Sequence, residues 1–156
     1  MAILGFCLVI LRRGGGICVI ICWARKIKEK GMGLVRKRLK LMGSKGEAEV
    51  EALFDTGASY SCIRPELAER LEILIPLRRP KELGTADGNT TVWVTVRVAL
   101  DFELDGVVLS DEFMVVPNLR REVIIGAKTM QAWRIKVDME KEQIVFDPRV
   151  GELWLL

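Results

Sequence analysis

Residues 52–59 read Ala-Leu-Phe-Asp-Thr-Gly-Ala-Ser. An acidic residue, Asp55, directly follows an apolar run and precedes a hydroxyl, a glycine and two small residues. This order predicts a carboxylate at the end of a buried strand, in a loop that lets another backbone approach closely. Gly57 has no Cβ to obstruct that approach. The loop N–H groups can point at the carboxylate, and the Thr56 hydroxyl can hydrogen-bond to a partner.

Short strands and turns are predicted on both sides of this stretch. Alternation of polar and apolar residues predicts strands at residues 34–42, 47–54, 91–102, 107–116, 135–138 and 143–146. Turns at 43–46 and at Asp105-Gly106 join the first four into hairpins. Short helices are predicted from Pro65 and over residues 127–133, and Pro76 and Pro80 predict a connector. Many short strands with little helix indicate an all-β domain.

Length and composition limit the protein's class. The 156 residues fit one domain with a core, without room for two full lobes. Half of the residues are hydrophobic and 29% are charged, which excludes a disordered chain and a bulk membrane protein. The net charge is only +3, and much of the basic excess lies in residues 25–40. The sequence therefore predicts no nucleic-acid partner.

The sequence contains no histidine. This absence excludes Ser–His and Cys–His nucleophilic mechanisms and most catalytic zinc sites. Enzymatic chemistry then falls mainly to carboxylates, lysines or Tyr60. The four cysteines form no CxxC pair, which favours reduced, buried thiols and a cytoplasmic location.

Residues 1–31 differ in composition from residues 32–150, which we predict to form the folded domain. Two apolar runs flank Arg12-Arg13 and three glycines, and neither run has the roughly 20 apolar residues that a spanning helix needs. Three interpretations stay open for this segment: a membrane anchor, an apolar tail, or an upstream start codon with Met32 as the true start. Membrane association is expected only through these residues.

The motif AxxDTGAS after a hairpin resembles the catalytic loop of retropepsin-like aspartic peptidases. Three further segments follow in the order of that family. Residues 83–89 resemble its flap, residues 123–126 with the following helix resemble its apolar-apolar-Gly segment, and residues 135–146 resemble its closing strands. The resemblance covers about residues 34–147. It implies a retropepsin-like acid-protease barrel with one or two short helices, acting as a symmetric homodimer.

The resemblance also implies a mechanism and a set of site residues. Only one Asp-Thr-Gly is present, so each subunit would supply one Asp55 to a pair that activates water against a peptide bond. Thr56 would lock the two loops together, and Gly57 would admit their close contact. No metal or cofactor is required. The residues implied to bind a peptide or protein substrate are Ala58, Ile125 and the flap tip Ala86, Asp87 and Gly88.

The sequence departs from the viral members of the family at one pair of positions. Those members place an Arg after the late glycine, paired with an acid after the catalytic triplet. Here Ala127 and Ser59 stand at these places, so both halves of the ion pair are missing. Asp87 also lies in a flap that is apolar and glycine-rich in viral enzymes.

Two functions other than an endopeptidase are also compatible with parts of the sequence. The same fold could serve as a catalytically weak dimerisation or peptide-binding domain, because an intact triplet indicates capacity rather than turnover. A strand that ends in Asp-x-Gly also opens the phosphate site of sugar-kinase and actin-like folds. Those folds need a longer chain, and Gly14-Gly15-Gly16 lacks the lysine of a phosphate-binding loop.

Overall fold

The computed structural model describes residues 34–85 and 90–151, so the segment 1–31 and the flap-tip residues Ala86, Asp87 and Gly88 lie outside the described residues. The strands in this part are β1 (Leu34–Gly43), β2 (Gly46–Asp55), β3 (Cys62–Ile63), β4 (Ile75–Gly84), β5 (Thr91–Leu104), β6 (Val107–Val115), β7 (Val123–Ile125), β8 (Lys136–Asp138) and β9 (Gln143–Val145). The helices are α1 (Pro65–Leu71), α2 (Ala127–Ala132) and the 3-10 turn η1 (Pro148–Gly151).

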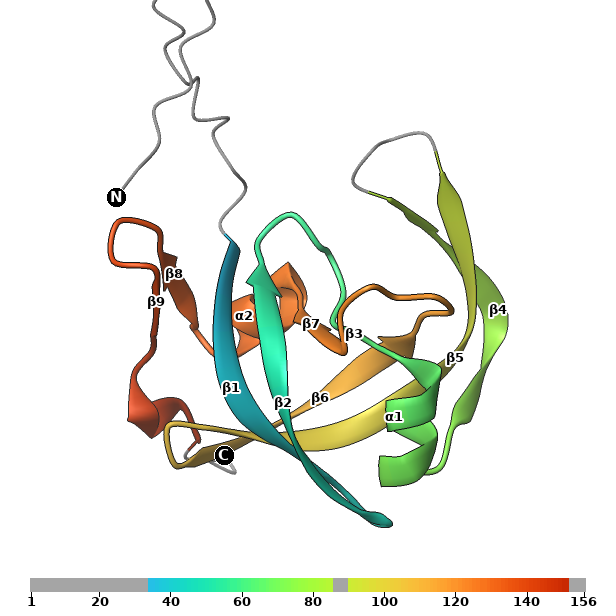
Figure 1. The fold of residues 1–156 in the computed structure, drawn as a ribbon, viewed down its shortest axis with the longest axis horizontal. Coiled ribbons are helices and arrows are strands. Elements are labelled where there is room, and N and C mark those ends of the chain that lie inside the picture. Colours follow the sequence, from blue (N-terminus) through green and yellow to red (C-terminus); the bar gives the residue numbers. More distant parts are fainter. Residues whose placement is uncertain (1–33, 86–89, 152–156) are drawn as a thin grey trace, which may run out of the picture. The chain divides into compact units, whose positions relative to one another are not determined.

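Six strands close into a barrel in the order β1-β2-β7-β3-β6-β5, and β5 returns to β1 (Figure 1). The closing contact joins residues 40–42 of β1 to residues 101–103 of β5. The earlier half of β5 pairs with β4 instead, which makes a two-stranded arm outside the ring. We call β4 with residues 91–97 the β4–β5 arm. The predicted all-β, retropepsin-like barrel with two short helices is confirmed, and its assembly into a homodimer remains a prediction.

The barrel interior is filled by the alternate residues that the sequence pattern predicts. On β2, Val50, Ala52 and Phe54 are all buried. Phe102 and Phe113, on the paired strands β5 and β6, meet edge to face with ring centroids 6.3 Å apart. Such aromatic pairs add to the free energy gained by burying their surface. Helix α1 begins with Pro65 and adds Leu67, Ala68 and Leu71 to the buried set.

The prediction of a connector at Pro76 and Pro80 is wrong, because both residues lie within β4. Proline has no N–H to donate to a ladder, so it is tolerated in edge strands and at bulges. β4 is the terminal strand of the sheet, and its register with β5 shifts between Pro76 and Lys81. The edge position and the bulge together accommodate the two prolines.

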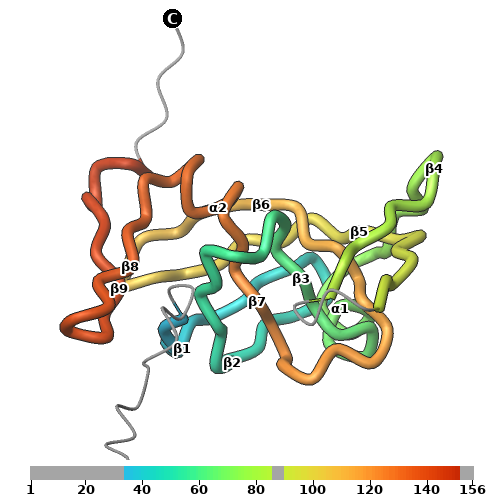
Figure 2. The backbone as a smooth tube through the Cα atoms, turned by 90° about the horizontal axis from the view of Figure 1, so that it is seen from above, coloured from blue at the N-terminus to red at the C-terminus, as the bar shows by residue number. Residues whose placement is uncertain are grey.

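The β8–β9 hairpin and the β4–β5 arm lie at opposite ends of the barrel, with β7 between β2 and β3 (Figure 2). The predicted closing hairpin is therefore present.

No helix within the described ranges is long and apolar enough to cross a bilayer. Cys62 is a free, buried thiol whose pKa burial raises to about 11, as the cysteine pattern predicts for one of the four.

The Glu72 carboxylate, directly after α1, binds the turn between β1 and β2 through hydrogen bonds that we call the Glu72 clasp. Ser44 donates to it from its hydroxyl and its N–H, each at 2.6 Å, and the Ile73 N–H donates at 2.8 Å. These hydrogen bonds, that of the Ser44 hydroxyl first, lower the pKa of Glu72 from 4.5 to about 2. The clasp fixes one end of the strand that leads to Asp55.

We predict that Glu72→Gln removes a pH-dependent part of the free energy of unfolding. Because the native pKa is depressed, ionised Glu72 stabilises the fold at pH above 4.5, and this contribution is lost as the pH falls through about 2. Urea denaturation should show the largest gap between wild type and variant at neutral pH and a smaller gap between pH 2 and 4.5. Glu69→Gln, on the same helix, is the control; an equal gap at every pH would contradict the clasp.

Candidate active site

Asp55 is the last residue of β2, a strand held on both sides. β1 pairs with β2 antiparallel, and β7 pairs with it in parallel with Phe54 opposite Ile125. The chain then turns sharply, because the Ala58 N–H donates to the Asp55 carbonyl at 3.2 Å. The Gly57 N–H donates to Asp55 Oδ1 at 2.8 Å, so a loop N–H does point at the carboxylate. Asp55 is half-buried, while Thr56 and Gly57 are exposed.

Backbone hydrogen bonds tie this loop to the start of α2. The Ala127 N–H donates to the Ala58 carbonyl at 2.7 Å, and the Lys128 N–H donates to the Ser59 carbonyl at 3.2 Å. The first N–H groups of a helix have no partner within it, so the loop carbonyls satisfy them. The connection therefore exists without the side-chain ion pair that Ser59 and Ala127 cannot form.

Gly126 lets the loop and the helix approach this closely. A Cβ at this position would lie 2.4 Å from the Tyr60 carbonyl carbon and 2.9 Å from the Ser61 nitrogen. Both contacts are with backbone, which cannot rotate away as a side chain can. The glycine that the sequence singled out in residues 123–126 is thus required by packing against the Asp55 loop.

A buried chain of hydroxyl groups runs beneath the loop and was not predicted from the sequence. Ser61 and Thr129 are 2% and 1% exposed. Thr129 donates to the Asp111 carboxylate, so its oxygen is left to accept from the Ser61 hydroxyl. The Gly126 N–H then donates to Ser61 Oγ at 3.0 Å. Each polar group in the chain has a partner, which is the condition for burying it without large cost.

Tyr60 belongs to the loop that follows Asp55 and faces the β4–β5 arm, with two lysines close to its ring. Lys128 Nζ is 4.0 Å and Lys81 Nζ is 4.6 Å from the ring centroid. A hydrogen bond from Lys128, followed by the positive charges of Lys81 and Lys128, lowers the pKa of Tyr60 below its ordinary 10.0. We call these three residues the Tyr60 cluster. Sequence reasoning named Tyr60 as a candidate but did not find the lysines.

The structure brings some of the predicted site residues together. Asp55, Thr56, Gly57 and Ala58 form one turn. Ile125 lies beside this turn on β7, but its side chain is fully buried in the core, and its contact with substrate stays a prediction.

The predicted flap tip, Ala86, Asp87 and Gly88, lies outside the described residues. Its base is closed by the N–H of Thr85, which donates to the Thr90 carbonyl at 2.9 Å. The structure therefore shows the arm that would carry the flap.

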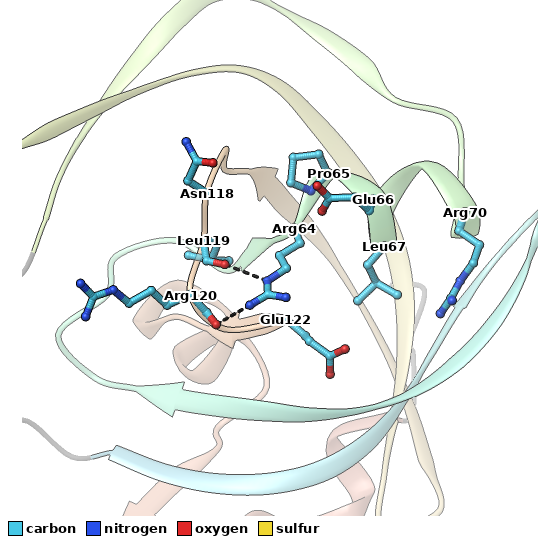
Figure 3. Close-up of a pocket in the computed structure, with 9 residues that line it drawn as sticks. All are labelled: Arg64, Pro65, Glu66, Leu67, Arg70, Asn118, Leu119, Arg120 and Glu122. Atoms are coloured by element: carbon cyan, nitrogen blue, oxygen red, sulfur yellow. Dashed lines mark hydrogen bonds between the residues drawn. The ribbon is translucent and has the colours of Figure 1, made fainter.

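A pocket of about 600 Å³ lies away from the Asp55 loop, between α1 and the turn that precedes β7 (Figure 3). The Arg64 guanidinium donates to the carbonyls of Leu119 and Arg120 and holds this turn against the helix. Its lining mixes both charges, with Glu66 and Glu122 beside the arginines.

Within the described residues, no group of three or more acidic or cysteine side chains is placed to hold a metal ion.

Comparisons of the sequence and of the structure with known proteins agree on the family and on the fold. The sequence model of the family described as "Aspartyl protease" matches residues 41–129. DNA damage-inducible protein 1 of Phaeosphaeria nodorum is 27% identical over 99 residues, which make up 63% of this chain. The match spans only 22% of that relative's length.

One solved domain shares the fold. The retroviral protease-like domain of Ddi1 from Leishmania major superposes with a TM-score of 0.54 at 21% identity and covers 75% of this chain and 89% of that one. EIAV protease, in complex with the inhibitor HBY-793, gives a TM-score of 0.47 at 16% identity, over 62% of this chain and 84% of that one.

We predict that Gly126→Ala lowers the free energy of unfolding by about 1–3 kcal/mol, because the new Cβ overlaps loop backbone. Gly46→Ala is the control, since nothing lies within 4 Å of a Cβ there. Urea denaturation measures both variants. If the two alanines had equal effects, the tight approach of loop and helix would not be present in solution.

We predict that Thr129→Val costs about 1–3 kcal/mol, because it leaves the hydroxyl proton of Ser61 without an acceptor and Oδ2 of Asp111 without a donor. Adding Ser61→Ala should then cost less than it does in the wild-type background, since the two hydroxyls share one hydrogen bond. A double-mutant cycle by urea denaturation measures this coupling. Strictly additive effects of the two substitutions would contradict the proposed hydrogen bond between the Ser61 and Thr129 hydroxyls.

Proposed function

Because the chain belongs to the aspartyl protease family, as its resemblance to retropepsin-like aspartic peptidases predicts, we propose that it is an aspartic endopeptidase that acts as a symmetric homodimer. We assign this activity to residues 32–150. Each subunit contributes one Asp55 to a pair of carboxylates on the two-fold axis. The substrate is a peptide or protein, and the reaction uses neither metal nor cofactor.

One observation carries this proposal: a single carboxylate stands on an exposed, tightly fastened loop, without a neutralising partner. Among residues 34–85 and 90–151, Asp55 forms no ion pair, and its carboxylate accepts a hydrogen bond only from Gly57. The sequence holds no second Asp-Thr-Gly. We interpret this single acid, on a loop fixed by backbone hydrogen bonds, as half of a catalytic pair of aspartates. A second copy of the chain supplies the other half.

The proposed mechanism needs only the two carboxylates and a water molecule. Like charges a few ångströms apart cannot both ionise easily, so the pair shares one proton. The ionised member takes a proton from the water, which attacks the scissile carbonyl carbon, while the protonated member donates to the carbonyl oxygen. As the tetrahedral intermediate collapses, the C–N bond breaks, and a carboxyl group returns a proton to the leaving amine.

The neighbouring residues take supporting roles in this proposal. The Thr56 hydroxyl is exposed at the turn and hydrogen-bonds to the partner's loop, and Gly57 admits that loop at close range. Ala58 borders the substrate. The flap tip, Ala86, Asp87 and Gly88, closes over the substrate, and Ile125, whose side chain is buried, supports the loop from inside.

We predict that Asp55→Asn lowers the rate of peptide cleavage at least about 100-fold, because an amide cannot exchange the proton that the mechanism moves. The full chain should be incubated with an unfolded protein across the acidic and neutral pH range, with Asp101→Asn as a control for a general loss of charge. The wild type and the control should show a bell-shaped profile with its maximum on the acidic side of neutral.

The oligomeric state of the same three proteins separates the competing functions. Analytical ultracentrifugation should find dimers in each case, because the substitution removes a proton donor and leaves the fold intact. Folded dimers that bind peptide but never cut would contradict the peptidase and favour a dimerisation or peptide-binding domain. Cleavage by a strictly monomeric protein would contradict the shared pair.

A further inference from the structure

The Tyr60 cluster joins three separate parts of the fold at one point. Tyr60 belongs to the loop that begins at Asp55, Lys81 to β4 and Lys128 to the first turn of α2. Lys128 is fixed at its backbone, since its N–H donates to the Ser59 carbonyl. Tyr60 and the arm residues Leu77 and Leu83 also pack against the same buried apolar cluster. The cluster therefore lies at the seam between the Asp55 loop and the β4–β5 arm.

Among the described residues, neither lysine of the cluster forms an ion pair. In the part of the chain that the structure describes, other lysines form ion pairs, such as Lys37 with Asp105 and Lys40 with Glu47, but neither Lys81 nor Lys128 lies within 4.0 Å of a carboxylate. The two lysine Nζ atoms cannot be farther apart than the sum of their distances to the centroid of the Tyr60 ring. That sum is shorter than the Debye length of about 10 Å at 0.1 M salt, so their potentials add.

This arrangement suits one kind of ligand. Tyr60 is only partly buried, so its ring leaves some apolar surface for methylene groups, and the ammonium groups over the ring offer donors to an anion. Holding two like charges near one ring costs free energy by repulsion, and a carboxylate placed between them relieves it. A neutral or basic side chain would gain the apolar contact and lose the electrostatic one.

We propose that Lys81 and Lys128, held around Tyr60, bind an acidic side chain of the peptide substrate and so select where the enzyme cuts. This proposal rests on the proposed function, because a peptide that lies between the Asp55 loop and the flap-bearing arm must pass the seam where the cluster lies. In a symmetric dimer the cluster occurs twice. The preference for acidic residues is therefore expected on both sides of the scissile bond, at corresponding positions.

Cleavage of matched peptides tests the selectivity. The full chain is given a positional library in which each position flanking a central Leu-Phe pair carries Glu, Gln or Lys in turn. We expect kcat/KM to be about tenfold higher for Glu than for Gln at the selected positions, as two partly exposed ion pairs would give. Lys81→Met with Lys128→Met should reduce this ratio to near one, and charge reversal of both to Glu should make the Lys peptide the better substrate.

Lys136→Met provides a matched control, because this lysine is exposed on β8 and lies outside the cluster. It should keep the wild-type ratio of Glu to Gln cleavage. A ratio that stays at tenfold in the double Met variant, or that falls equally in the control, would overturn the assignment.

A second readout does not depend on turnover. Tyr60 is the single tyrosine of the chain, so the absorbance of its phenolate can be titrated directly. In the Asp55→Asn full chain, the best Glu peptide should raise the pKa of Tyr60 toward 10.0, because the bound carboxylate offsets the lysine charges. The matched Gln peptide should leave it unchanged. An equal shift with free glutamate at the same concentration would mean a general anion site and overturn the peptide assignment.

The two readouts separate failure of this inference from failure of the proposed function. Cleavage without any preference for Glu, and without a shift in the Tyr60 titration, would overturn the inference and leave the peptidase intact. A Tyr60 shift specific to the Glu peptide in a protein that never cuts would support the cluster as an acidic-peptide site and contradict the endopeptidase.

Discussion

The parallel pairing of β2 with β7 is the constraint on which the candidate site depends. Two parallel strands end at the same edge of a sheet, so the segments that follow them meet there. One segment is the Asp55 loop and the other is Gly126 with α2. Because Gly126 has no Cβ, the two segments come close enough for the helix N–H groups to bond to the loop carbonyls. The position of the carboxylate, the buried hydroxyl chain and the backbone of Lys128 all follow from this one junction.

The way the junction is held differs from the ion pair of the viral enzymes, and the difference has a physical consequence. Ala127 and Ser59 are joined to the rest of the site through backbone groups, which do not titrate. A buried ion pair carries a desolvation cost and is weakened when its acid is protonated. Neutral N–H to carbonyl bonds keep their strength in acid. A loop fastened in this way holds its shape in the pH range where two carboxylates share a proton.

The elements that the sequence predicts are those that local chemistry determines. Alternation and a two-residue turn are enough for the hairpins, and the Asp55 turn is formed by hydrogen bonds between neighbours in the chain. Closure of β5 onto β1 was not predictable, because it depends on how far β5 extends beyond the arm. The strand through Pro76 was missed because only its edge position makes proline acceptable. The contact between Ser61 and Thr129, and the meeting of two lysines at Tyr60, join residues distant in sequence, and no local pattern marks them.

Both described pockets lie away from the candidate site, as a cleft shared by two subunits would require. Two pockets of the described chain, of about 600 and 390 Å³, open beside Arg64 and beside Glu72, and neither is lined by Asp55. A cleft shared by two subunits would have only one wall in each, which fits a carboxylate that is half-buried in the single copy. The proposed two-fold symmetry would also bring two copies of the Tyr60 cluster to the dimer. In the proposed dimer, the paired carboxylates with their shared proton would carry one negative charge, whereas the four ammonium groups of the clusters would carry four positive charges. A cleft with this balance is positive on both flanks of the reacting centre, which favours the approach of acidic chains and loses that advantage as salt is added.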